Sequence, residues 1–125
     1  MSPISYEIED GVALITVDNA PVNALSHVVR SGLADAFAQF ETDGSADIAV
    51  IIGAGRMFIG GADISEFGKP PKSPGLTQLI SQIEACTKPV VAGIHGVALG
   101  GGLDIALGAP YRMALSGSQV GLPEV

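Results

Sequence analysis

The chain has 125 residues, about one domain's worth and too few for separate cofactor and substrate lobes. Apolar residues make up 47% and charged residues 15%, which excludes a disordered or low-complexity chain. Six Lys and Arg stand against 13 Asp and Glu, and this net charge of -7 argues against nucleic acid or an anionic membrane as partner. We expect no membrane span and no signal peptide, because no apolar run approaches the roughly 18 residues of a transmembrane helix and the first residues lack a basic and apolar leader.

The first third of the sequence predicts a hairpin followed by a helix. Apolar and polar residues alternate on both sides of Asp10-Gly11, which predicts two strands, over 4–8 and 12–17. A loop, PVNALS, follows, and Ser26 can cap a helix that runs to about Thr42. The apolar stripe of this helix consists of Val29, Leu33, Ala36, Phe37 and Phe40.

The rest of the chain alternates apolar runs with glycine-rich turns. The runs 46–52 and 89–94 predict strands buried on both faces, and 111–114 predicts a third strand. A glycine-rich loop entering a short helix follows the first run, a helix is expected near 76–86, and a second glycine turn enters a further helix. This alternation predicts an α/β fold with crossover connections. The single cysteine, Cys86, is expected to pack against a helix and fits a reducing compartment.

Several well-known active-site motifs are absent from the sequence. The nearest approach to a dinucleotide fingerprint, GAGRMF, has Phe58 in place of the third glycine, and no P-loop or G-x-S-x-G segment occurs. Two histidines, His27 and His95, and one cysteine cannot supply a recognisable metal cluster. These absences disfavour nucleotide oxidoreduction, phosphoryl transfer, acyl-serine chemistry and a bound metal.

Two glycine-rich junctions between a predicted strand and a predicted helix remain, Gly60-Gly61-Ala62-Asp63 and Gly100-Gly101-Gly102. The first amides of a helix lack intrahelical acceptors, and glycine lets a ligand atom approach them closely. Two such junctions aimed at one point would form an oxyanion hole from backbone alone. The alternative is that these glycines serve only tight turns and close helix–strand packing.

Two carboxylates stand out by their positions, Asp104 in the turn after Gly102 and Glu124 in GLPEV. Paired carboxylates beside an oxyanion hole suit proton transfer at the α-carbon of a carbonyl compound. The alternatives are an acid favoured by a helix dipole for Asp104 and an exposed loop acid for Glu124. His95 is interpreted as a packed core residue rather than a base.

These segments resemble the enoyl-CoA hydratase/isomerase (crotonase) superfamily. The matching motifs occur in the family's order: PVNALS, GRMFIGGADISEF, KPVVAGIHGVALGGGLDIALG, YRMA and GLPEV. The sequence is most similar to the hydratase segment of bifunctional hydratase/3-hydroxyacyl-CoA dehydrogenases. The resemblance implies a crotonase-like ββα spiral, an enzyme of fatty-acid β-oxidation and an acyl-CoA substrate, with coenzyme A as part of that substrate and no separate cofactor.

The resemblance also implies roles for individual residues. The amides of Ala62 and Gly101 would form the oxyanion hole, and Asp104 and Glu124 would be the catalytic acids. The implied reaction is hydration of a trans-2-enoyl-CoA, isomerisation of a 3-enoyl-CoA, or both, through a stabilised enolate. The residues expected to line the coenzyme A region are Asn23, Ala24, Leu25, Asp63 and Ile64.

Two departures from the family pattern qualify these expectations. Asp104 stands where a glutamate is usual, which withdraws the carboxylate by one methylene and weakens hydration more than isomerisation. The family domain is about twice as long, so residues 1–125 are expected to be its N-terminal part. We therefore expect a homo-oligomer or a segment of a longer bifunctional chain, cytoplasmic in a bacterium, although peroxisomal-type relatives exist and no targeting signal is visible. The competing hypothesis is a non-catalytic fragment that binds coenzyme A or a protein.

Overall fold

The computed structural model of the chain describes residues 3–19, 23–54, 59, 61–62, 73–94, 97–99, 111–114 and 119–121. These residues form one five-stranded sheet, two small two-stranded sheets and two helices. The elements are β1 (Ile4–Glu9), β2 (Val12–Val17), β3 (Ala24–Leu25), α1 (His27–Thr42), β4 (Ile48–Gly53), β5 (Gly61–Ala62), α2 (Leu76–Glu84), β6 (Val90–Ile94), β7 (Val97–Leu99), β8 (Tyr111–Ala114) and β9 (Gln119–Gly121).

The five-stranded sheet has the order β1-β2-β4-β6-β8 and begins with the predicted hairpin. β1 and β2 pair antiparallel, from Ile4 opposite Val17 to Glu9 opposite Val12. Asp10 and Gly11 connect them with φ angles of 52° and 81°. Positive φ at both central residues is what a two-residue turn of type I′ requires, and it matches the right-handed twist of the strands. The hairpin predicted from the sequence is confirmed.

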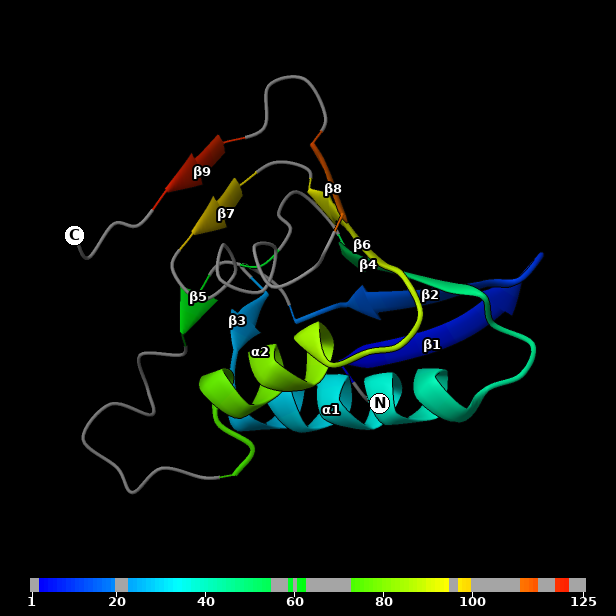
Figure 1. Ribbon diagram of the computed structural model, residues 1–125. Helices are drawn as coiled ribbons and strands as arrows, with labels where there is room; N and C mark the ends of the chain where they lie inside the picture. The colour runs from blue at the N-terminus through cyan, green and yellow to red at the C-terminus, as the bar shows by residue number, and fades with distance from the viewer. Residues whose placement is uncertain are drawn as a thin grey trace.

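The remaining pairs of this sheet are parallel and need crossover connections. β2 pairs with β4, β4 with β6 and β6 with β8, all in parallel. The two helices lie side by side and cover one face of the sheet (Figure 1). This arrangement confirms the α/β class and the crossovers that the sequence predicts.

The core lies between that covered face and the two helices. All five residues of the predicted stripe on α1 are buried, and Ser26 caps the helix by accepting a hydrogen bond from the amide of Val29 at 3.3 Å. β1 approaches α1 closely at Gly32, where a Cβ atom would lie 2.6 Å from Cγ1 of Ile4. The fully buried large side chains are Phe37, Phe40, Ile15, Leu25, Leu33, Ile51, Ile59, Leu79, Ile83 and Val17.

The structure corrects several details of the sequence analysis. Burial alternates along β4, so the prediction that 46–52 is buried on both faces is wrong: Ala49 and Ile51 are buried, whereas Val50 is only partly covered. The segments treated as loops or glycine turns contain the short strands β3, β5, β7 and β9, whose two or three residues show no periodicity. The helices expected after the two glycine-rich segments lie outside the described residues.

Candidate functional site

The pairing of β3 with β5 brings two predicted site segments together. Ala24 lies opposite Gly61 and Leu25 opposite Ala62 in parallel register. The expected oxyanion-hole residue Ala62 is therefore the strand neighbour of the segment expected to contact coenzyme A, although the two are far apart in the sequence. In Figure 1 this small sheet lies beyond the carboxyl end of β2.

The other predicted site residues are approached by a second pair of short strands. β7 and β9 pair in parallel, with Leu99 opposite Gly121. The carboxyl ends of parallel strands lie at one edge of a sheet, so the chain leaves β7 and β9 at the same edge. Gly101 follows β7 by two residues and Glu124 follows β9 by three. The residues Gly101, Asp104, Glu124, Asp63 and Ile64 themselves lie outside the described part of the chain, and their roles stay predictions.

Asn23 is the one polar residue that is fully buried in the described part of the chain, with 2% of its surface exposed. Its Oδ1 accepts a hydrogen bond from the amide of Asn19 at 2.8 Å, and its Nδ2 donates to the carbonyl of Ala54 at 3.0 Å. Its own amide donates to the carbonyl of Asn19 at 2.9 Å. These bonds join the end of β2, the end of β4 and the start of β3 into one unit.

Both residues of β3 accept side-chain hydrogen bonds at their main-chain carbonyls. Nδ2 of Asn19 donates to the carbonyl of Ala24 at 3.0 Å, and Nη1 of Arg30 donates to the carbonyl of Leu25 at 2.7 Å. The Leu25 side chain is 1% exposed and packs in the core. Asn19 and Arg30 were not predicted from the sequence, because a residue that bonds main-chain carbonyls carries no motif of its own.

The first turn of α1 also fixes the chain just before α2. Nε of Arg30 donates to the carbonyl of Pro74 at 2.9 Å, and Nε2 of His27 lies 2.9 Å from the carbonyl of Ser73. Arg30 therefore ties β3 to the residues that precede α2. The described residues just before α2 are thereby bonded to the first turn of α1.

A second polar cluster joins the end of α1 to the start of β6. Nζ of Lys88 donates to the carbonyls of Asp43 and Ala46 at 2.9 and 2.8 Å and lies 4.5 Å from the centre of the Phe40 ring. The Glu41 carboxylate accepts hydrogen bonds from the amide and the hydroxyl of Thr87. This cluster joins the end of α1 to the residues before β6 and contains none of the predicted site residues.

Hydrogen bonding sets the protonation of the acids in this cluster. The hydroxyl and amide of Thr87 lower the pKa of Glu41. The hydroxyl and amide of Ser45, followed by the Tyr6 hydroxyl, lower the pKa of Asp43. Burial, together with the hydrogen bond to Asp43, raises the pKa of Tyr6 from 10.0 to about 12. These shifts reflect structural hydrogen bonds rather than a catalytic pair.

Cys86 follows the end of α2 and packs at the edge of the core, as expected for a packing residue. Burial, with a smaller contribution from the charge of Glu41, raises the pKa of its thiol. Its Sγ lies 3.5 Å from the carbonyl of Gln82. The thiol is therefore kept protonated at neutral pH and is a poor nucleophile.

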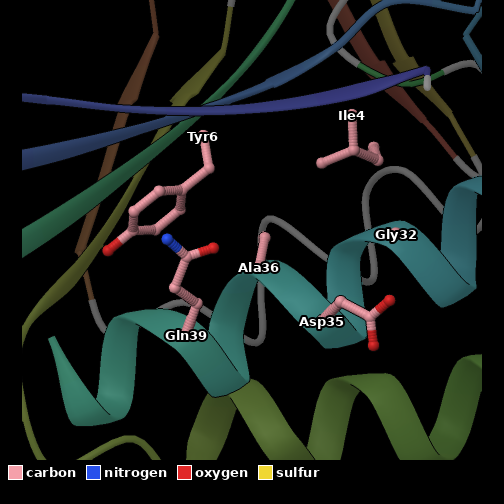
Figure 2. Close-up of a pocket in the computed structure, with 6 residues that line it drawn as sticks. All are labelled: Ile4, Tyr6, Gly32, Asp35, Ala36 and Gln39. Carbon is pink, nitrogen blue, oxygen red and sulfur yellow. The ribbon is translucent and has the colours of Figure 1, made fainter. Parts of the chain in front are cut away.

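A shallow pocket of about 190 Å³ opens between β1 and α1 (Figure 2). It is lined by Ile4, Tyr6, Gly32, Asp35, Ala36 and Gln39. None of the predicted site residues borders it, so this pocket is separate from the candidate site.

The described residues contain no cluster of three or more His, Cys, Asp or Glu that could bind a metal ion. Of the two helices in this part of the chain, neither combines the length and the apolar character needed to cross a membrane.

Comparison with known proteins places these features in one family. The family model for enoyl-CoA hydratase/isomerase matches residues 7–125. The chain belongs to the enoyl-CoA hydratase/isomerase family. It is 48% identical over 121 residues to the peroxisomal bifunctional enzyme of Danio rerio, covering 96% of this chain and 17% of that protein. It is 40% identical over 132 residues to a probable enoyl-CoA hydratase of Bacillus subtilis, covering 100% of this chain and 51% of that protein.

Solved structures of the enoyl-CoA hydratase/isomerase family have the same fold. One family member superposes with a TM-score of 0.88 at 33% identity over 98% of this chain and 51% of its own. An enoyl-CoA hydratase/carnithine racemase from Magnetospirillum magneticum gives 0.89 at 30% identity, over 98% and 50%. The family and the partial crotonase-like fold inferred from the motifs are confirmed. The chain spans about half the length of these two structures and of the Bacillus relative, and about a sixth of the bifunctional enzyme.

Proposed function

We propose that the protein acts on acyl-CoA thioesters in fatty-acid β-oxidation, as a hydratase of trans-2-enoyl-CoA, an isomerase of 3-enoyl-CoA, or both. The observation that carries the proposal is the family match over residues 7–125, because it runs through every predicted site residue from Asn23 to Glu124. The pairing of Leu25 with Ala62 supports it, since it joins the predicted coenzyme A segment to the predicted oxyanion-hole residue.

Both reactions pass through an enolate of the thioester. In the proposed mechanism the amides of Ala62 and Gly101 donate hydrogen bonds to the thioester oxygen as negative charge develops on it. In isomerisation the Glu124 carboxylate removes a proton from C2 of the 3-enoyl chain, and the proton returns at C4 as the double bond moves into conjugation. In hydration a water oxygen adds to C3 and a proton is delivered to C2.

The identity of residue 104 bears on the balance between the two reactions. Asp104 orients the attacking water, or bonds to the partner acid, in this proposal. A carboxylate that is one methylene shorter reaches the water less well, because proton transfer needs hydrogen-bond contact. We therefore propose that isomerisation is favoured over hydration relative to a family member with glutamate at this position.

The remaining parts of the proposal concern the setting of the activity. Coenzyme A enters and leaves as part of the substrate, and no separate cofactor is required. We propose that the protein works as a homo-oligomer or within a longer bifunctional chain, in the bacterial cytoplasm or in a peroxisome-type compartment as for the peroxisomal bifunctional relative named above.

The test is the turnover of both substrates by the full-length protein. Loss of the conjugated thioester absorbance of a trans-2-enoyl-CoA reports hydration, and its appearance from a 3-enoyl-CoA reports isomerisation. Conversion of either substrate supports the proposal. Binding of both thioesters in calorimetry without turnover would instead favour the non-catalytic coenzyme A-binding alternative.

A further inference from the structure

We propose that Asn23 is a positioning residue for the oxyanion hole: its side chain fixes β3, and β3 fixes Ala62 of β5. This inference rests on the proposed function and deepens it. It gives Asn23 a role through the chain's own backbone rather than through contact with coenzyme A.

Both polar atoms of the Asn23 side chain form hydrogen bonds with main-chain groups inside the protein. The side-chain oxygen faces the amide of Asn19 at 2.8 Å and the side-chain nitrogen faces the carbonyl of Ala54 at 3.0 Å. The orientation of the amide group is fixed by these partners, because a main-chain N–H needs an acceptor and a carbonyl needs a donor. With 2% of the residue exposed, the side chain is closed off from any molecule outside the chain.

The backbone at Asn23 adds a second constraint on residue type. Its φ angle is 51°, in the left-handed region that asparagine and glycine tolerate and most other residues avoid. This conformation turns the chain from the end of β2 into β3, and the reciprocal bonds between Asn19 and Asn23 close the turn. Asparagine is thus the residue that meets both demands at once, a left-handed turn and a two-ended side-chain bridge.

The strands β3 and β5 need such external support. Each has two residues, and each is the other's sheet partner. A two-stranded pair is marginal even when its strands are longer, so a pair of this length cannot define its own place. β3 is held by the Asn23 bridge to Ala54, by the bonds of Asn19 and Arg30 to its carbonyls, and by its buried Leu25 side chain. β5 lies beside β3 (Figure 1), and its position is set by this pairing together with Ile59, which is fully buried just before β5. The direction of the Ala62 amide depends on that position.

A displaced Ala62 amide should reduce the catalytic rate strongly. An oxyanion-hole donor works only when it is aimed at the developing charge, and a misplacement of about 1 Å costs on the order of 100-fold in rate. Loss of the Asn23 bridge should therefore reduce kcat more than it raises KM, because the thioester still binds but its oxygen is less well stabilised in the transition state.

Three variants of the full-length protein separate this role from general stability. Asn23→Gly keeps the left-handed turn and removes the side-chain bridge. Asn23→Asp keeps the acceptor for the Asn19 amide but places a carboxylate oxygen against the Ala54 carbonyl. Lys88→Met is the control, because it removes two partly buried hydrogen bonds from the polar cluster between α1 and β6, which contains none of the predicted site residues.

Two sets of measurements test each variant, one on the unliganded protein and one with an acyl-CoA. The first is the amide chemical shift of Ala62 and Leu25 in the unliganded protein, with thermal unfolding recorded alongside. The second is kcat and KM on a 3-enoyl-CoA, together with the infrared shift of the thioester carbonyl in a bound, slowly reacting acyl-CoA.

We expect Asn23→Gly and Asn23→Asp to move the Ala62 and Leu25 resonances, lower kcat by about 10- to 100-fold and reduce the carbonyl shift. Lys88→Met should lower the melting temperature and leave all three unchanged. Unmoved Ala62 resonances, or equal kcat in Asn23→Gly and Lys88→Met, would overturn the positioning role. A wild-type protein that neither binds nor converts an acyl-CoA would overturn the proposed function instead, and the resonances alone would then decide whether Asn23 places β5.

Discussion

The five-stranded sheet and the two small sheets are built on different principles. In the large sheet the long strands β1, β2 and β4 have six residues each, and alternating burial along β2 and β4 fixes which face meets the helices. In the small sheets the strands have two or three residues, and β3 is held by side chains outside it, such as Asn23 and Arg30. Hydrophobic burial stabilises the large sheet, whereas the β3–β5 pair, which contains part of the predicted site, combines one buried side chain, Leu25, with hydrogen bonds from its neighbours.

The largest expected effect falls on activity, at Glu124, three residues after β9. Glu124→Gln keeps the shape of the side chain and removes the group that moves the proton, which typically contributes about 10²–10⁴-fold. We expect kcat/KM on both enoyl-CoA substrates to fall by that amount while acyl-CoA binding and thermal stability stay near wild type. Full activity of Glu124→Gln on both substrates would remove this residue from the mechanism.

The converse effect is expected in the scaffold. Phe37 is 1% exposed and belongs to the core beneath the large sheet. Phe37→Ala should lower the free energy of unfolding by about 3–5 kcal/mol, because it removes a buried ring and leaves a cavity. Denaturant titration measures this loss, and Val28→Ala, at a residue 60% exposed on the same helix, is the matched control. At a temperature where Phe37→Ala is still folded, its KM should equal that of wild type. A large change in KM there would contradict the proposal that the core and the candidate site are independent.

Residue 104 offers a finer test within the site. If the aspartate is too short to share the water, Asp104→Glu should raise hydration, and Asp104→Asn should impair hydration modestly and isomerisation hardly at all. The measurement is kcat/KM of each variant on a trans-2-enoyl-CoA and on a 3-enoyl-CoA. A loss of hydration in Asp104→Glu would indicate a site built around aspartate.

A smaller loss of stability is expected when Lys88 is removed from the polar cluster between α1 and β6. Lys88→Met removes hydrogen bonds to two carbonyls and the contact of the ammonium with the Phe40 ring. Hydrogen bonds to charged groups and cation–π contacts suggest a loss of about 1–2 kcal/mol, measured as a shift in the denaturant midpoint. Wild-type stability in Lys88→Met would show that these bonds do not stabilise the fold.

The smallest expected effect is the dependence of stability on pH. Asp43 and Glu41 have lowered pKa values in the folded chain, so their stabilising contribution is present above their ordinary pKa values of 3.8 and 4.5 and is lost as pH falls through the folded values. Tyr6 has a raised pKa, so its contribution is complete below pH 10.0 and is lost as pH rises toward about 12. Unfolding curves of wild type and Tyr6→Phe across the alkaline range should converge above pH 12, and parallel curves would contradict the assignment.

The sequence predicted the scaffold well for a physical reason. Burial of one face leaves a periodic record in the chain, so the alternation around Asp10-Gly11 and the apolar stripe of α1 could be recognised without coordinates. A left-handed turn and a helix cap are local as well, and Ser26 was found by the residues next to it.

The small sheets could not be predicted in the same way. The partner of Leu25 is Ala62, and nothing in the residues around either of them specifies that pairing. The segment containing Asn23 was predicted to lie near coenzyme A from the family motif alone, and the motif does not reveal that its amide bonds Asn19 and Ala54. Non-local hydrogen bonds leave no period in the sequence, so the site's residues were predicted by resemblance and its supports were found in the structure.

The order of strands in the large sheet has a consequence for how the protein is made. The sheet order β1-β2-β4-β6-β8 is also the order of these strands along the chain. Each new long strand therefore joins the edge left by the one before it, and no strand must be inserted between two already paired. The β1–β2 hairpin, whose contacts are local, can form while later residues are still being synthesised, and each parallel addition then waits for one crossover to close. Such a sheet can grow from one edge at the pace of the ribosome, because each new strand is added beside the most recently paired one.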